Sequence, residues 1–312
     1  MARDASWPPA PEPLPVSLVD NHTHLDAVLA ETDDRGWRGR GDDTGRADDT
    51  GVADLLAAAV AVGVDRVVQI GCDLPSLSWT DAVVRAHPGL VGGLAIHPNE
   101  AVLHAGVHEI APDGLDPDPR AHHRIPLEEA IAAVADLARA NDRIRVIGET
   151  GLDHFRAGER GRAVQREAFR AQIALAKELG LVLQIHDRDA HEDVLAVLAA
   201  DGAPERTVFH CFSGDAAMAA HCVERGWYLS FAGTITFRAA TDLREALHRV
   251  PLDRLLLESD APYLTPHPYR GRPNAPYLVA QTARAVATEL DVDLADLCGT
   301  VSATAEQVYG PW

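Results

Sequence analysis

The sequence is poor in positive charge. Its 312 residues include 28 lysines and arginines against 47 aspartates and glutamates, which gives a formal net charge of −19 at pH 7. An acidic surface repels phosphate groups, so this balance argues against nonspecific binding to nucleic acid or to anionic lipid. It does not exclude a small local site, because bound cations reverse the sign of the potential there.

The sequence also lacks a long hydrophobic run. The longest, at 55–64, is too short to cross a bilayer, so we expect no association with a membrane. The N-terminal region lacks the apolar core of a signal peptide and instead contains the prolines Pro8, Pro9, Pro11, Pro13 and Pro15. We therefore expect a Pro-rich tail over 1–15 and a cytoplasmic protein.

Cysteine is scarce. The four cysteines are Cys72, Cys211, Cys222 and Cys298, and no pair has C-x-x-C spacing. A chain of this length does not need disulfides, so a reducing compartment fits the sequence. The hydrophobic fraction of 46% excludes a disordered chain or a fibre. The sequence has no heptad repeats, and nothing else in its hydrophobic pattern indicates an obligate protein partner.

What the sequence does contain is a regular alternation of short apolar strands and helices. We predict eight strands, at 16–20, 66–70, 90–96, 144–147, 181–185, 207–209, 227–231 and 255–257. Continuous apolar strands are typical of a parallel sheet buried on both faces. Eight of them favour a single-domain α/β fold, a (β/α)8 TIM barrel over 16–312. A doubly wound open sheet is the alternative, although no Gly-x-Gly-x-x-Gly follows the first strand.

Two polar segments interrupt this alternation. We interpret 31–50 and 104–125 as loop insertions, because they are rich in Asp, Gly, Pro and charged residues. The second segment holds four histidines, namely His104, His108, His122 and His123. We expect these histidines to be solvated, with adventitious metal binding.

Residues that can bind metal ions stand at the ends of six predicted strands: His22, His24, His97, Glu149, His186, His210 and Asp260. In a TIM barrel the carboxyl ends of all the strands face one mouth, so these side chains are expected to converge. Imidazole and carboxylate are ligands for Zn²⁺ or Mn²⁺, whereas Mg²⁺ prefers oxygen. The number of ligands suits two ions, with Glu149 between them.

Each of these residues has an ordinary structural explanation when it is taken alone. A His-x-His pair is a weak signal, Glu149 after a glycine can cap a helix, and Asp260 before Ala-Pro can begin a turn. Their joint position at strand ends is what predicts a metal centre.

The same residues lie in motifs that resemble those of the TatD family of metal-dependent hydrolases. The matching stretches are 20–26 (DNHTHLD), 96–98 (IHP), 148–153 (GETGLD), 184–186 (QIH), 209–214 (FHCFSG), 258–264 (ESDAPYL) and 268–274 (PYRGRPN). The resemblance runs from about residue 16 to the C-terminus. Two features depart from it: the insertions at 31–50 and 104–125, and His154 in place of a frequent tyrosine.

The resemblance implies a dinuclear phosphodiesterase, a 3′-to-5′ exodeoxyribonuclease that uses two divalent ions (Mg²⁺, Mn²⁺ or Zn²⁺). By motif position, the first ion belongs to His22, His24, Glu149 and Asp260. The second belongs to Glu149, His186 and His210. Glu149 and Asp260 are the catalytic residues, and Asp260 is expected to accept the proton of the attacking water.

Substrate contacts are expected from His97, Arg270 and Arg272. Each of the two arginines can donate a pair of hydrogen bonds to phosphate oxygens. A solvated loop explains the two arginines equally well. The expected partner is DNA, bound weakly as a single strand or at 3′ ends, because few phosphates are neutralised.

Two other functions remain open. The same dinuclear site suits a hydrolase of a small-molecule or aminoacyl ester or amide. A non-enzymatic metal-binding or nucleic-acid-binding protein is the second alternative, and the complete ligand set together with a candidate base argues against it.

Overall fold

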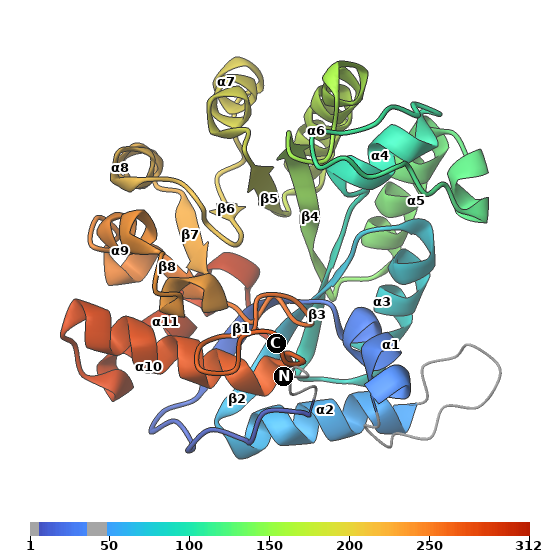
Figure 1. Cartoon of the computed structure of the whole chain (residues 1–312). Coiled ribbons are helices and arrows are strands. Elements are labelled where there is room, and N and C mark those ends of the chain that lie inside the picture. The colour runs from blue at the N-terminus through green and yellow to red at the C-terminus, as the bar shows by residue number, and fades with distance from the viewer. Residues whose placement is uncertain (1–5, 36–48) are drawn as a thin grey trace. The chain divides into compact units, whose positions relative to one another are not determined.

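A computed structural model describes residues 6–35 and 49–312. Eight strands alternate with helices and form one sheet in the order β1-β2-β3-β4-β5-β6-β7-β8 (Figure 1). The strands are β1 Leu18–Thr23, β2 Val64–Gly71, β3 Leu90–Leu94, β4 Ile144–Asp153, β5 Val182–Arg188, β6 Thr207–Phe209, β7 Tyr228–Phe231 and β8 Leu255–Leu257. Neighbouring strands pair in parallel, which confirms the predicted (β/α)8 TIM-barrel class.

Helices follow the strands along the chain. The α-helices are α1 Leu25–Arg35, α2 Asp49–Ala61, α3 Leu74–Ala86, α4 Pro98–His104, α5 Leu127–Ala140, α6 Glu159–Leu179, α7 His191–Asp201, α8 Ala216–Glu224, α9 Thr241–Leu247, α10 Val279–Leu290 and α11 Leu294–Tyr309. Short 3-10 helices are η1 Ala121–Arg124, η2 Gly233–Thr236, η3 Leu252–Arg254 and η4 Pro276–Leu278. Gly180 ends α6 with a φ of 63°, the left-handed stop that the sequence predicts.

The chain divides into two compact units. The first contains 1–69, 214–225 and 229–312, and the second contains 70–213 and 226–228. Nearly every strand residue is inaccessible to solvent, and buried apolar side chains form the core of each unit. In the second unit α6 packs along β4, as Figure 1 shows in green. The predicted boundary between the 1–15 tail and the 16–312 domain stays a prediction.

The structure corrects several sequence predictions about local elements. The polar segment predicted at 31–50 is helical at both ends, where α1 and α2 lie, and 36–48 falls outside the described residues. The segment at 104–125 begins on the last residue of α4 and carries η1 near its end. His104 and His123 are buried there, so the prediction that these two histidines are solvated is wrong.

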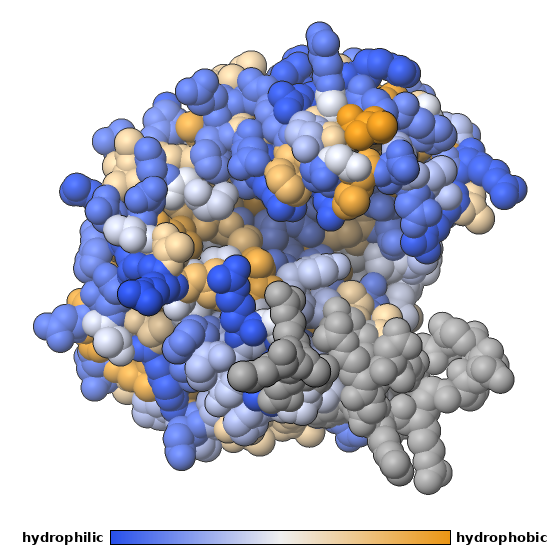
Figure 2. Space-filling view, viewed as in Figure 1, coloured by the Kyte–Doolittle hydropathy of each residue, from blue (hydrophilic) through white to orange (hydrophobic). Residues whose placement is uncertain are grey.

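The surface is mainly polar. Figure 2 shows a face on which hydrophilic residues predominate and hydrophobic residues form small separate patches. This agrees with the net charge of −19. Across 6–35 and 49–312, no helix combines the length and the apolar character needed to span a bilayer.

Candidate metal centre

The first unit brings His22, His24 and Asp260 together. The Nε2 atoms of the two imidazoles are 3.1 Å apart. Oδ1 of Asp260 lies 3.7 Å from Nε2 of His22 and 3.8 Å from Nε2 of His24. Ligands about 2.1 Å from one tetrahedral ion lie about 3.4 Å from one another, so these three atoms have the spacing of a single-ion site.

Buried polar contacts between β1 and the chain after β8 hold this cluster. Asp20 is fully buried and accepts hydrogen bonds from the backbone N–H (2.8 Å) and the hydroxyl (2.6 Å) of Ser259. Burial raises the pKa of Asp20 to about 8. The backbone N–H of Asp260 donates to the carbonyl of His22 at 3.0 Å. Asp20 belongs to the motif at 20–26, but the sequence alone assigns it no role.

Asn21 secures the same strand from the opposite face. Its side-chain amide donates to the hydroxyl of Ser230 and to the carbonyl of Leu257, both at 2.7 Å. Its side-chain oxygen accepts from the hydroxyl of Tyr309 at 2.9 Å. A buried amide that is fully hydrogen-bonded fixes the strand in one position, because each lost partner leaves a polar group without compensation.

The second unit brings Glu149, His186 and His210 together. Oε2 of Glu149 lies 2.6 Å from Nε2 of His210 and 3.0 Å from Nδ1 of His186. The two imidazole atoms are 3.5 Å apart. A carboxylate and two imidazoles fit the donor chemistry of one divalent ion, and the 3.5 Å between the imidazoles fits its ligand spacing, whereas the 2.6 Å between Glu149 and His210 is a direct ion-pair contact.

Asp153 lies behind this cluster. Its Oδ2 is 3.4 Å from Nε2 of His186, on the side of the ring away from Glu149. Asn99 donates to Oδ2 at 3.0 Å, and the backbone of Arg156 donates to Oδ1 at 2.9 Å. A carboxylate behind a histidine is the usual arrangement that orients a metal-binding imidazole. Asp153 belongs to the motif at 148–153, but the sequence alone does not indicate this role.

Gly151 allows β4 to approach the backbone of His186. Its φ is 149°, and a Cβ built there would lie 2.0 Å from the carbonyl oxygen of His186. Any other residue would therefore push β5 away from β4 at the position of a candidate ligand.

The electrostatics of the second cluster are strongly coupled. Burial opposes ionisation of Glu149, but His210 beside it holds the pKa of Glu149 well below the usual range. Burial also opposes protonation of His186, but the nearby carboxylates of Asp153 and Glu149 outweigh it and raise the pKa of His186 to about 9. Burial and the neighbouring His186 lower the pKa of His97 to about 3, so His97 is neutral.

The raised pKa of His186 predicts that metal binding releases a proton. Below about pH 9 the metal-free imidazole is protonated, whereas a ligand imidazole must be neutral. Affinity should therefore rise about tenfold per pH unit from about pH 7 to 9 and then level off. Calorimetric Mn²⁺ titrations in buffers of different ionisation enthalpy should show close to one proton released at pH 7. Binding with no proton release would contradict this prediction.

The remaining predicted site residues are His97, Arg270 and Arg272. Nδ1 of His97 accepts a hydrogen bond from the backbone N–H of Asn99 at 3.1 Å, and its ring centroid is 4.5 Å from that of His186. Arg270 is exposed, with its guanidinium 4.6 Å from the ring centroid of Phe237. Arg272 donates to the backbone of Ser6 and Trp7, which indicates a structural role; its role in substrate binding stays a prediction.

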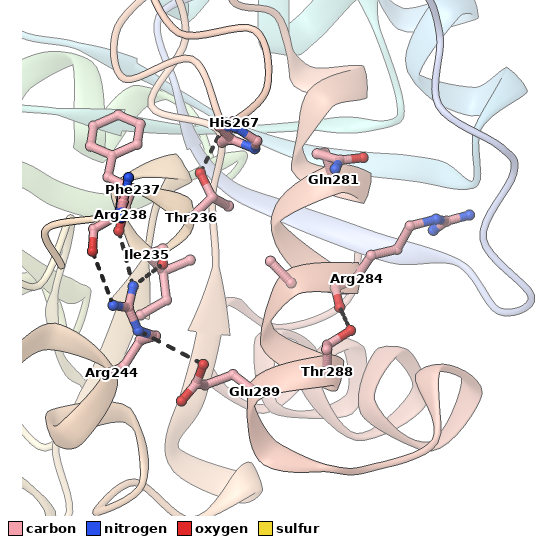
Figure 3. Close-up of a pocket in the computed structure, with 11 residues that line it drawn as sticks. Ile235, Thr236, Phe237, Arg238, Arg244, His267, Gln281, Arg284, Thr288 and Glu289 are labelled. Atoms are coloured by element: carbon pink, nitrogen blue, oxygen red, sulfur yellow. Dashed lines mark hydrogen bonds and ion pairs between the residues drawn. The ribbon is translucent and has the colours of Figure 1, made fainter. Parts of the chain in front are cut away.

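A pocket with arginines in its walls lies in the first unit. Its volume is about 600 Å³, and η2, α9 and α10 supply most of its lining. Figure 3 shows Arg244 directed toward the backbone around Ile235 and toward Glu289. The side chain of Arg284 extends from α10 away from Arg244 and donates to the carbonyls of Glu12 and Pro13. Phe237 lines the pocket, so Arg270, stacked on that ring, adds positive charge beside it.

A parallel (β/α)8 fold with imidazoles and carboxylates gathered at its strand ends is typical of TIM-barrel metal-dependent hydrolases. The sequence profile of the family described as TatD related DNase matches residues 19–310. The chain therefore belongs to the TatD family of metal-dependent hydrolases.

Known relatives cover nearly the whole chain. An uncharacterized metal-dependent hydrolase TatD from Mycobacterium tuberculosis is 39% identical over 94% of this chain and 98% of its own length. A 3′-5′ ssDNA/RNA exonuclease TatD from Citrobacter rodentium is 30% identical over 82% of this chain and 91% of its own length. The crystal structure of YjjV, a TatD homologue from Escherichia coli, is similar in fold, with a TM-score of 0.74 at 21% identity, covering 94% of this chain and 97% of that one.

Proposed function

We propose that this TatD family hydrolase removes nucleotides from the 3′ ends of single-stranded DNA. The observation that carries the proposal is the pair of three-ligand clusters, His22–His24–Asp260 and Glu149–His186–His210. The exonuclease name of the Citrobacter rodentium relative supports a nucleic-acid substrate. We further propose that each cluster holds one of the two divalent ions that the resemblance implies.

Bound divalent ions would supply Lewis acidity toward the phosphoryl group and lower the pKa of water toward about 7. Asp260 would then accept the proton of the attacking water at a carboxylate oxygen and pass it to the leaving 3′ oxygen. Asp153 would keep the ring of His186 in one orientation through its Nε2.

The first unit also offers groups suited to a nucleotide. Tyr263 is 55% exposed, and its ring centroid is 5.9 Å from that of His24. An exposed aromatic ring beside a candidate ligand is suited to stacking on the terminal base. The arginines near Phe237 would attract the neighbouring phosphates despite the acidic character of the chain.

The proposal is tested with 5′-labelled single-stranded DNA in Mg²⁺, Mn²⁺ or EDTA. A metal-dependent ladder that shortens from the 3′ end supports it, and phosphorothioate linkages at the 3′ end should stop the ladder. RNA and duplex DNA of the same sequence define the preference. No cleavage by folded, metal-loaded protein, together with hydrolysis of an aminoacyl ester, would favour the small-molecule alternative.

Arg270 provides a test of phosphate recognition. An exposed ion pair between Arg270 and a phosphate would contribute up to about 1 kcal/mol to the free energy of DNA binding. Arg270→Gln should therefore raise KM for DNA about threefold to fivefold and leave kcat unchanged. The slope of log KM against log salt should fall by about 0.7, the value for one phosphate contact on a single strand. Arg160→Gln, an exposed arginine on α6, is the control and should change neither value. An unchanged salt slope for Arg270→Gln would contradict the assignment.

A further inference from the structure

A separate group of metal-binding side chains lies in the second unit, where α4 and η1 meet. Nε2 of His122 is 3.3 Å from Oε2 of Glu100, and Nε2 of His123 is 2.7 Å from the same oxygen. The ring centroid of His104 is 5.0 Å from that of His123 and 5.9 Å from that of His122. Two imidazoles therefore contact one carboxylate, and the ring of a third histidine lies beside both of them.

His104 has a buried nitrogen that the protein does not satisfy. The residue is 5% exposed, and its Nδ1 lies 2.7 Å from the carbonyl oxygen of Ile125. That contact requires the proton on Nδ1, which leaves a lone pair on Nε2. Nε2 has no hydrogen-bond partner in the described part of the chain. A buried acceptor without a partner is costly, and a metal ion is one group that removes the cost.

His104 is also oriented as metal-binding histidines are. Such imidazoles commonly donate one ring N–H to a backbone carbonyl and present the other nitrogen to the ion. The contact between His104 and Ile125 is of this kind.

His123 has a different role in the group. Its Nδ1 accepts a hydrogen bond from the backbone N–H of Arg120 at 2.6 Å, so its proton sits on Nε2. That proton is donated to Oε2 of Glu100. His123 therefore orients the carboxylate, and its own lone pair is already used by Arg120.

We propose that Glu100, His104 and His122 bind a divalent transition-metal ion, with Zn²⁺ as the expected occupant. Two imidazoles and one carboxylate, with a place for water, form a common zinc ligand set. Imidazole ligands disfavour Mg²⁺, which prefers oxygen. The 3.3 Å between His122 and Glu100 matches the separation of about 3.4 Å between two ligands of one tetrahedral ion.

The ion has a route of entry and a structural consequence. The side chains of Glu100 and His122 are 24% and 18% exposed, so solvent reaches the site. Binding would join the last residue of α4 to η1 and close the segment 105–120 at its base. The first turn of α4 carries Asn99, which holds Asp153. The site would thus fix a helix that supports the Glu149 cluster, and this inference does not depend on the nuclease proposal.

The test counts Zn²⁺ ions on the full-length protein. Metal-free wild type, His122→Ala and Glu100→Gln are loaded with Zn²⁺, dialysed against excess Mg²⁺ and analysed for metal content and Tm. Wild type should retain about one Zn²⁺ more than either variant, and its Zn²⁺-dependent rise in Tm should be larger than that of either variant. His108→Ala removes an exposed histidine of the same segment and should behave as wild type.

Co²⁺ gives an independent readout of the same site. Wild type and His108→Ala should show the strong visible absorption of a four-coordinate ion, reduced by the contribution of this site in His122→Ala. Equal Zn²⁺ content in wild type and in both variants would overturn the proposal and leave only a hydrogen-bonded histidine cluster. If His122→Ala is misfolded by circular dichroism, the isosteric Glu100→Gln variant decides the outcome.

Discussion

Asp260→Asn should lower kcat on single-stranded DNA about a thousandfold and leave KM within about threefold. Removing a proton acceptor typically costs between about 10² and 10⁴ in rate. The amide retains an oxygen near His22 and His24 but cannot accept the proton. Single-turnover assays with Mn²⁺ in excess over both clusters measure the effect on the chemical step.

Asparagine is the informative replacement because of the backbone at this position. Asp260 has a φ of 50°, a left-handed conformation that Asp and Asn adopt more readily than other residues with a Cβ. Asp260→Ala would add backbone strain to the loss of the carboxylate. Asp291→Asn is the matched control, since Asp291 has a φ of 53° at the end of α10. It should leave both kcat and Tm unchanged.

The outcome also separates enzyme from binding protein. If Asp260→Asn weakens DNA binding as much as turnover, Asp260 is a structural ligand and does not accept the proton. If wild type binds DNA in the presence of metal but shows no turnover, the non-enzymatic alternative is favoured.

The sequence predicts the fold class because buried parallel strands are continuous apolar runs separated by helices. The sequence predicts the ends of the strands less well. Glu149 and His186 were expected just beyond their strands, yet β4 and β5 continue past them to Asp153 and Arg188. Polar residues at the end of a strand look like loop residues in a sequence. The sequence does not show that the backbone of a metal ligand can still be hydrogen-bonded to a neighbouring strand.

The candidate ligands could be predicted because they occur in short, specific motifs. The residues that support them could not be assigned roles in the same way. Asp153 acts through His186, and Asn99 acts through Asp153, so neither role shows in local spacing. His104 and His123 were misjudged because composition indicates a polar segment but not which of its side chains are buried, whereas His108 is exposed as predicted. His104 is the last residue of α4 and is buried there.

Asp153→Asn should weaken metal binding to the Glu149 cluster between about tenfold and a hundredfold. Replacing the group behind a metal-binding histidine typically costs this much, because the ring loses its orientation and some of its basicity. The carboxylate of Asp153 also helps to raise the pKa of His186, so the variant should release less of a proton at pH 7 when Mn²⁺ binds. Calorimetric titration measures both quantities in one experiment.

Excess metal distinguishes this effect from damage to the chemistry. Asp153→Asn should recover most of the wild-type kcat at saturating Mn²⁺, whereas Asp260→Asn should not recover at any concentration. Asp187→Asn is the control, since Asp187 is a buried carboxylate 2.9 Å from Nδ1 of His191, which belongs to neither cluster. Its metal affinity should equal that of wild type. If Asp153→Asn binds Mn²⁺ with wild-type affinity and releases as many protons as wild type, Asp153 neither orients His186 nor raises its pKa.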